Sequence, residues 1–106
     1  MSKPDRVLGH VGSRLLFEND RVRVWELCLE PGARSAVHRH DLDYLLVQIA
    51  GDRIAAIPEP DSGGKHTQYI EAQVEPGRVS YLTRGGIETA VNVGHQPYRE
   101  ILIELK

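Results

Sequence analysis

The stretch Pro31–Gly51, PGARSAVHRHDLDYLLVQIAG, contains the features that decide the fold. It opens on a Pro-Gly turn, carries His38 and His40 one residue apart, and continues into an apolar segment that begins at Tyr44. Residues two apart on a strand point to the same face, so the two imidazoles are expected to project together. Two imidazoles on one face are good ligands for a first-row transition metal.

The composition is that of an ordinary globular domain. The chain has 106 residues, of which 41% are hydrophobic and 26% charged, and its net charge is −2. That length is enough for one domain with a modest core. Basic residues do not gather into a stripe, which argues against a nucleic-acid partner, and no apolar run is long enough to cross a bilayer. The N-terminus lacks the apolar core of a signal peptide, so a cytoplasmic location is expected.

Short apolar segments separated by Gly, Pro and Asp predict an all-β protein. The turns at Glu30 and Glu75 have the composition of type II turns, and Gly51 with Asp52 is expected to close a hairpin. The final segment is expected to pair either inside the sheet or across a dimer interface. The expected strands are Arg21–Leu29, Tyr44–Ala50, Arg53–Ile57, Thr67–Val74, Arg78–Thr83, Ile87–Val93 and Tyr98–Leu105. Short strands at this spacing indicate a sandwich or a small barrel.

Two further features bear on function. The single cysteine, Cys28, excludes an internal disulfide, and its place on an expected strand favours a small buried residue over a catalytic thiol. The polar loop Pro58–His66 is expected to be a surface connection. If that loop overhangs a cavity instead, it would bring His66 to the cavity mouth.

The opening stretch also matches a spaced motif, G-x5-H-x-H-x3-E-x6-G. Gly32 stands at the first glycine, His38 and His40 at the two histidines, and Gly51 at the last glycine. The glutamate position holds Tyr44, which is a departure from the motif.

A second motif, G-x5-P-x-G-x2-H-x3-N, matches the C-terminal half of the chain. Gly77, Gly85 and Asn92 stand at its two glycines and its final asparagine. Thr83 replaces the proline, and Glu88 replaces the histidine. The spacing between the matched positions is conserved throughout.

In both motifs the chain resembles the cupins, and among them a small single-domain protein of the bacterial type. The resemblance covers residues 19–106 and implies a cupin-type jelly-roll β-barrel there, with residues 1–18 as an N-terminal arm or edge strand. It also implies a metal site, because metal-binding cupins use the two histidines and the glutamate of the first motif and the histidine of the second. Of that ligand set, this chain retains His38 and His40 in kind.

The replaced positions still provide metal-binding chemistry. Glu88 supplies a carboxylate, and two histidines with one carboxylate form the facial triad that holds Fe(II), with Mn, Ni and Zn as further candidate ions. Tyr44 would serve as a ligand, as a proton donor in catalysis and substrate binding, or as a plug of the cavity. Gln48 would bind a substrate oxygen or a water molecule. A shift of one residue in the second motif would direct Thr89 into the barrel instead of Glu88.

Three functions are compatible with this pattern. A metal-dependent enzyme would act on a small organic molecule, as the dioxygenases, isomerases and decarboxylases among the cupins do. A binding module would hold a small ligand without converting it. A vestigial barrel would bind neither metal nor ligand. In each case a homodimer is expected, since additional strand pairing stabilises a small β fold.

Overall fold

The computed structural model describes residues 6–63 and 67–106, which form strands and loops without a helix. Among these residues there is accordingly no helix with the length and apolarity needed to cross a bilayer. The strands are β1 (Arg14–Glu18), β2 (Val22–Leu29), β3 (His38–Arg39), β4 (Tyr44–Ala50), β5 (Arg53–Pro58), β6 (Ile70–Gln73), β7 (Val79–Leu82), β8 (Ile87–Asn92) and β9 (Tyr98–Leu105). The predicted all-β class is therefore confirmed.

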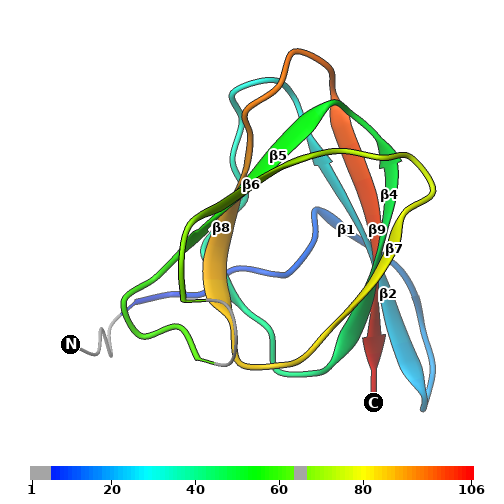
Figure 1. Ribbon diagram of the computed structural model, residues 1–106. Coiled ribbons are helices and arrows are strands. Elements are labelled where there is room, and N and C mark those ends of the chain that lie inside the picture. The colour runs from blue at the N-terminus through cyan, green and yellow to red at the C-terminus, as the bar shows by residue number, and fades with distance from the viewer. Residues whose placement is uncertain (1–5, 64–66) are drawn as a thin grey trace.

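The strands form two sheets that face each other (Figure 1). The larger sheet has the order β1-β2-β9-β4-β7, and the smaller has the order β3-β8-β5-β6. Within the described ranges these sheets share no ladder of paired strands, so they face each other without closing into one continuous barrel. The seven expected strands are present. Two of them, Tyr44–Ala50 and Tyr98–Leu105, have the expected bounds. The others differ at their ends, and the largest shift is at β6, where pairing begins at Ile70 instead of Thr67.

Strand β9 lies at the centre of the larger sheet. It pairs along its whole length with β2 on one side and with β4 on the other. Because both of its edges are bonded within the chain, the first of the two expected alternatives, pairing inside the sheet, is the one found. Its inner face consists of four buried side chains, Tyr98, Glu100, Leu102 and Glu104.

Gly51 is required where the chain passes from one sheet to the other. The expected hairpin at Gly51-Asp52 is not found, because β4 belongs to the larger sheet and β5 to the smaller. Gly51 has a φ of 126°, and a Cβ atom there would lie 2.9 Å from Cδ1 of Tyr98. The crossing therefore needs both the conformational freedom and the small size of glycine.

The inner faces of the sheets enclose a cavity between two apolar clusters. One cluster contains Val11, Trp25, Tyr44 and Leu102, and the other contains Leu27, Leu29, Val74 and Tyr98. The cavity has a volume of about 140 Å³. Alternation along β2 directs Trp25, Leu27 and Leu29 inward and Cys28 outward, so the predicted burial of Cys28 is wrong.

Replacing Gly51 with alanine is expected to destabilise the fold more than the same change at Gly32. Gly32 also has a positive φ, 82°, but a Cβ atom there meets nothing within 4 Å. We expect Gly32→Ala to lower the free energy of unfolding by about 1 kcal/mol, for backbone strain alone. Gly51→Ala adds the contact with Tyr98 and should cost about 3 kcal/mol. Urea denaturation of both variants measures the difference, and equal losses would contradict the role assigned to the Tyr98 contact.

Candidate metal centre

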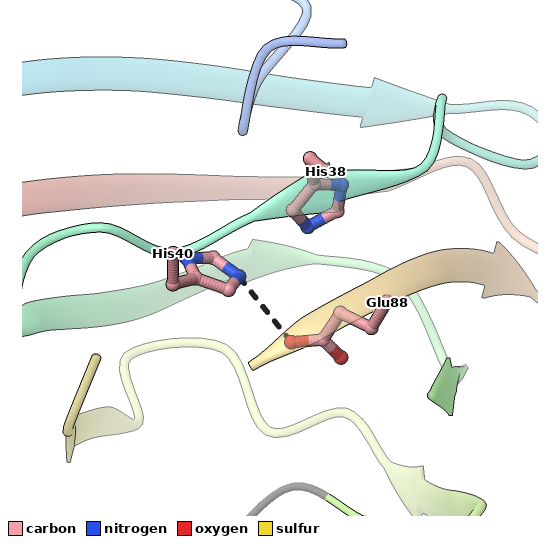
Figure 2. Close-up of side chains that lie close together, drawn as sticks. All are labelled: His38, His40 and Glu88. Carbon is pink, nitrogen blue, oxygen red and sulfur yellow. Dashed lines mark ion pairs between the residues drawn. The ribbon is translucent and has the colours of Figure 1, made fainter. Parts of the chain in front are cut away.

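His38, His40 and Glu88 come together at one end of the cavity (Figure 2). His38 lies on β3, His40 follows it at the next inward position, and Glu88 lies on β8. The antiparallel pairing of these strands places His38 directly opposite Glu88. One ligand atom from each residue lies within 4.8 Å of those from the other two, and all three side chains are buried.

The imidazole of His38 is held in one tautomer. Its Nδ1 lies 2.9 Å from the carbonyl oxygen of Ala36, which can only accept a hydrogen bond, so Nδ1 carries the proton. The Nε2 atom of the neutral ring then has a lone pair that is free to bind a metal ion. Burial lowers the pKa of His38, although the Ala36 hydrogen bond opposes this effect. Both features favour the neutral imidazole that a metal ion requires.

Ser35 supports this arrangement and was not identified from the sequence. Its hydroxyl donates to the Ala36 carbonyl at 2.9 Å and accepts from the Ala90 N–H at 2.9 Å. The residue thus joins the segment before β3 to β8, and it orients the carbonyl that holds His38. A serine in a loop is too common for its sequence position to reveal such a role.

His40 is fixed through its main chain and its ring. Its N–H donates to the Gly86 carbonyl, and its carbonyl accepts from the Gly85 N–H, both at 2.9 Å. Its ring stacks on Tyr44 with 4.1 Å between the centroids and an angle of 15° between the planes. Nε2 lies 3.3 Å from Oε1 of Glu88, while Nδ1 is buried with no hydrogen-bond partner among the described residues.

These groups fit a divalent transition metal. Metal–ligand bonds of about 2.1 Å place neighbouring ligand atoms roughly 3 Å apart, which is close to the separation of His40 and Glu88. Two imidazoles with one carboxylate suit Fe, Mn, Ni or Zn.

Tyr44 lines the cavity beside the three ligand groups. Burial and the nearby charges of Glu88 and Glu100 raise the pKa of Tyr44 far above its usual range. Its hydroxyl therefore keeps its proton at physiological pH and acts as a hydrogen-bond donor instead of a base. The position also lies in the apolar cluster with Trp25 and Leu102, so Tyr44 serves packing and the site together.

The remaining predicted site residues lie as follows. Gln48 is buried and lines the cavity, with its Oε1 accepting from the Glu75 N–H at 2.9 Å. Thr89 lies on the face of β8 opposite Glu88 and does not line the cavity. His66 falls outside the described residues.

Glu100 is a second cavity carboxylate that the sequence analysis missed. It lies on β9, its side chain is buried, and Tyr98 donates a hydrogen bond to Oε1 at 2.5 Å. Burial raises the pKa of Glu100 to about 7, and the charge of Glu88 adds to this rise while the Tyr98 hydrogen bond opposes it. The outward positions of β9 hold the apolar residues Ile101, Ile103 and Leu105, so the sequence pattern indicated that this face, and not the face of Glu100, points inward.

Glu100 is expected to make stability fall as the pH rises. Its pKa in the folded chain, about 7, exceeds the ordinary 4.5, so between these pH values the folded chain retains a proton that the unfolded chain loses. The free energy of unfolding should therefore decrease across this window, on the order of 3 kcal/mol in total. Glu100→Gln should remove this loss and be more stable than the unchanged chain at about pH 8. Urea denaturation of the metal-free proteins from about pH 4.5 to about pH 8 measures the free energy of unfolding of both proteins.

Glu71→Gln provides the control. Glu71 is an exposed carboxylate whose pKa is lowered, chiefly by a hydrogen bond from Arg53 and further by one from Tyr69. Its contribution to stability is present at higher pH and is lost on acidification, which is the opposite sign. Parallel pH profiles for the Glu100→Gln variant and the unchanged chain would contradict the raised pKa of Glu100.

Comparison with solved structures identifies the fold. A cupin domain from Bordetella pertussis gives a TM-score of 0.74 at 22% identity, covering 88% of this chain and 90% of that one. A sugar phosphate isomerase of the cupin superfamily from Silicibacter pomeroyi gives 0.56 at 20% identity, covering 82% of this chain and 52% of that one. The polyketide cyclase RemF from Streptomyces resistomycificus gives 0.55 at 20% identity, with coverage of 82% and 56%.

These comparisons confirm the cupin-type jelly roll that the two motifs predicted. At such identities the likeness concerns the fold, and the chemistry has to be argued from the residues of this chain. No protein-family model and no curated protein matches the sequence.

Proposed function

We propose that this cupin-fold chain is a metal-dependent enzyme that converts a small organic molecule in its cavity. The proposal is carried by one observation, the convergence of His38, His40 and Glu88 at one end of a cavity that is otherwise largely apolar. The two enzymes of the same fold, a sugar phosphate isomerase and a polyketide cyclase, support catalysis on small molecules as a use of this barrel.

The cavity is suited to a small substrate. Its volume of about 140 Å³ lies well below the roughly 300 Å³ typical of pockets for drug-sized ligands. Ile70 lines the cavity and is half exposed, so the cavity meets solvent near β6.

Each polar residue of the cavity has a distinct task in this proposal. His38, His40 and Glu88 would hold the metal ion, which when bound polarises a substrate oxygen as a Lewis acid. Tyr44, which keeps its proton, donates a hydrogen bond to a substrate oxygen beside them. Gln48 has its carbonyl bound to the main chain at Glu75 and its amide beside the Tyr98 hydroxyl, so one amide N–H is left to orient a ligand.

Removal of both histidines is expected to abolish metal binding. The unchanged chain, purified without an affinity tag, should carry close to one equivalent of Fe, Mn, Ni or Zn by elemental analysis. The double variant His38→Ala/His40→Ala should lose at least about tenfold in metal content, because a single carboxylate remains in the site.

His95→Ala is the matched control for this measurement. His95 is an exposed histidine in the turn between β8 and β9, outside the cavity, and its loss should leave the metal content unchanged. If the unchanged chain takes up none of these ions even after reconstitution, the enzyme proposal fails. The barrel would then be a ligand-binding or vestigial one.

Tyr44→Phe is expected to separate metal binding from catalysis. The change keeps the ring that stacks on His40 and removes only the hydroxyl. Metal content should stay the same, whereas turnover in a screen of small ketones, sugars and organic acids should fall roughly 10²-fold. Tyr81→Phe, at an exposed tyrosine on β7, should change neither quantity. Equal turnover in both variants would exclude Tyr44 as the proton donor.

The homodimer and the cytoplasmic location stay predictions. Strand β1 is an edge of the larger sheet, and its five residues are exposed, among them Leu15 and Phe17. This edge is the surface that would carry a contact between two copies of the chain.

A further inference from the structure

Glu100 is a buried carboxyl group that is not among the candidate metal ligands. It stands on β9, in the larger sheet, whereas two of the three candidate ligands come from the paired strands β3 and β8 of the smaller sheet. It is 5% exposed and nevertheless lines the same cavity. A buried carboxyl group costs free energy, so a position on a cavity wall calls for a functional explanation.

The surroundings of Glu100 hold it in place and leave room in front of it. Tyr98 donates to Oε1, and no described residue donates a hydrogen bond to Oε2. Gln48 is its partner in the register of β4 with β9, and its amide helps to orient the Tyr98 hydroxyl. Across the cavity, the lining from the smaller sheet includes Ala56, Ala72 and Ala90, whose short side chains leave space.

The charges of the cavity restrict what can occupy that space. Two carboxyl groups, Glu88 and Glu100, line it, and the described lining residues include no lysine or arginine. The charge of Glu88 would be compensated by the metal ion, but the part of a ligand that lies near Glu100 would find no cationic side chain among these described residues, so a phosphate or carboxylate group there would be repelled. The chemistry favours a small uncharged compound with carbonyl or hydroxyl groups.

We propose that Glu100 is a further catalytic residue, which exchanges a proton with a small uncharged substrate bound between it and the His38–His40–Glu88 group. This inference rests on the proposed function and adds to it a proton-transfer residue and a substrate class. The ionised carboxylate takes a proton from a carbon or oxygen atom of the substrate. The C–H or O–H bond breaks, its electron pair stays on the substrate, and a new O–H bond forms on Glu100. The reverse transfer returns a proton to the product.

The protonation equilibrium of Glu100 suits this task. Burial brings its pKa to about 7, where a group can both accept and release a proton near neutral pH. The titratable groups that face it are Tyr98 on its own strand, Tyr44 on β4 and Glu88 on β8. Burial raises the pKa of both tyrosines, so neither competes with Glu100 as a base.

The test uses glycidol, a small uncharged epoxide, as a covalent probe of the 106-residue chain. The Glu100 carboxylate oxygen would attack an epoxide carbon, the ring C–O bond would break, an ester would form, and the ring oxygen would take a proton from water. Mass spectrometry of peptides locates the adduct. Glycidol phosphate, the anionic counterpart, tests the substrate class on the same protein.

We expect glycidol to modify Glu100 at least about tenfold faster than glycidol phosphate does, and faster at about pH 8 than at about pH 5.5. Glu104 is the internal control, because it is buried on the same face of β9 but binds Trp25 and Arg23 and does not line the cavity. It should stay unmodified. Glu100→Gln should remove the cavity adduct, and Ala72→Leu, which narrows the cavity without touching Glu100, should slow its formation.

Several outcomes would overturn the inference. They are an adduct on Glu104 at the same rate, no adduct on Glu100, a rate that does not change with pH, and equal reaction with both probes. Elemental analysis of the same samples separates the two proposals. Metal without modification of Glu100 rejects the inference alone, and modification without any metal rejects the metal-dependent enzyme.

Discussion

Two hydrogen bonds between the main chain of His40 and the Gly85–Gly86 turn hold the site together. They join the segment after β3 to the start of β8, and with the β3–β8 pairing they set His38 opposite Glu88 and His40 beside it. Because side chains on a strand alternate between faces, a shift of one residue in this pairing would turn Glu88 out of the cavity. The chemistry of the barrel therefore depends on the register of one short antiparallel contact.

The cavity occupies the place where a chain of this size would otherwise have a continuous core. Two small apolar clusters lie beside it, and polar groups such as Gln48, Glu88 and Glu100 line it. Buried carboxyl groups lower the stability of a small domain, and the central position of β9, bonded on both edges, offsets part of that loss. The buried polar residues that lower stability line one cavity, which is the pattern expected of a functional site.

The fold and the chemistry of this chain rest on different observations. Its likeness to solved cupin structures concerns the path of the chain, at 22% identity for the Bordetella pertussis domain. The ligand set is its own, with Glu88 at the position of a motif histidine and Tyr44 at the position of a motif glutamate. Tyr44 stacks on His40 where a further ligand would stand, so the candidate metal centre has two imidazoles and one carboxylate.

The sequence by itself determined the all-β class, most strand positions and the projection of His38 and His40 to one face, because turn residues and alternation are local properties. The motif spacing also identified Glu88 and the cupin fold. Only the tertiary structure decided which face of β9 points inward. Its apolar residues at 101, 103 and 105 are half-buried on the outer face, while Glu100 and Glu104 are buried on the inner one.

The other differences between the sequence-based predictions and the structure have the same origin. Gly51-Asp52 looked like a hairpin turn, but the strands on either side of it belong to different sheets. Cys28 looked buried, but the inward positions of β2 belong to its neighbours in the chain. A sequence shows which residues of a strand share a face. It does not show which of the two faces packs against the opposite sheet. That choice is made when the two sheets pack and the favourable burial of one face outweighs that of the other.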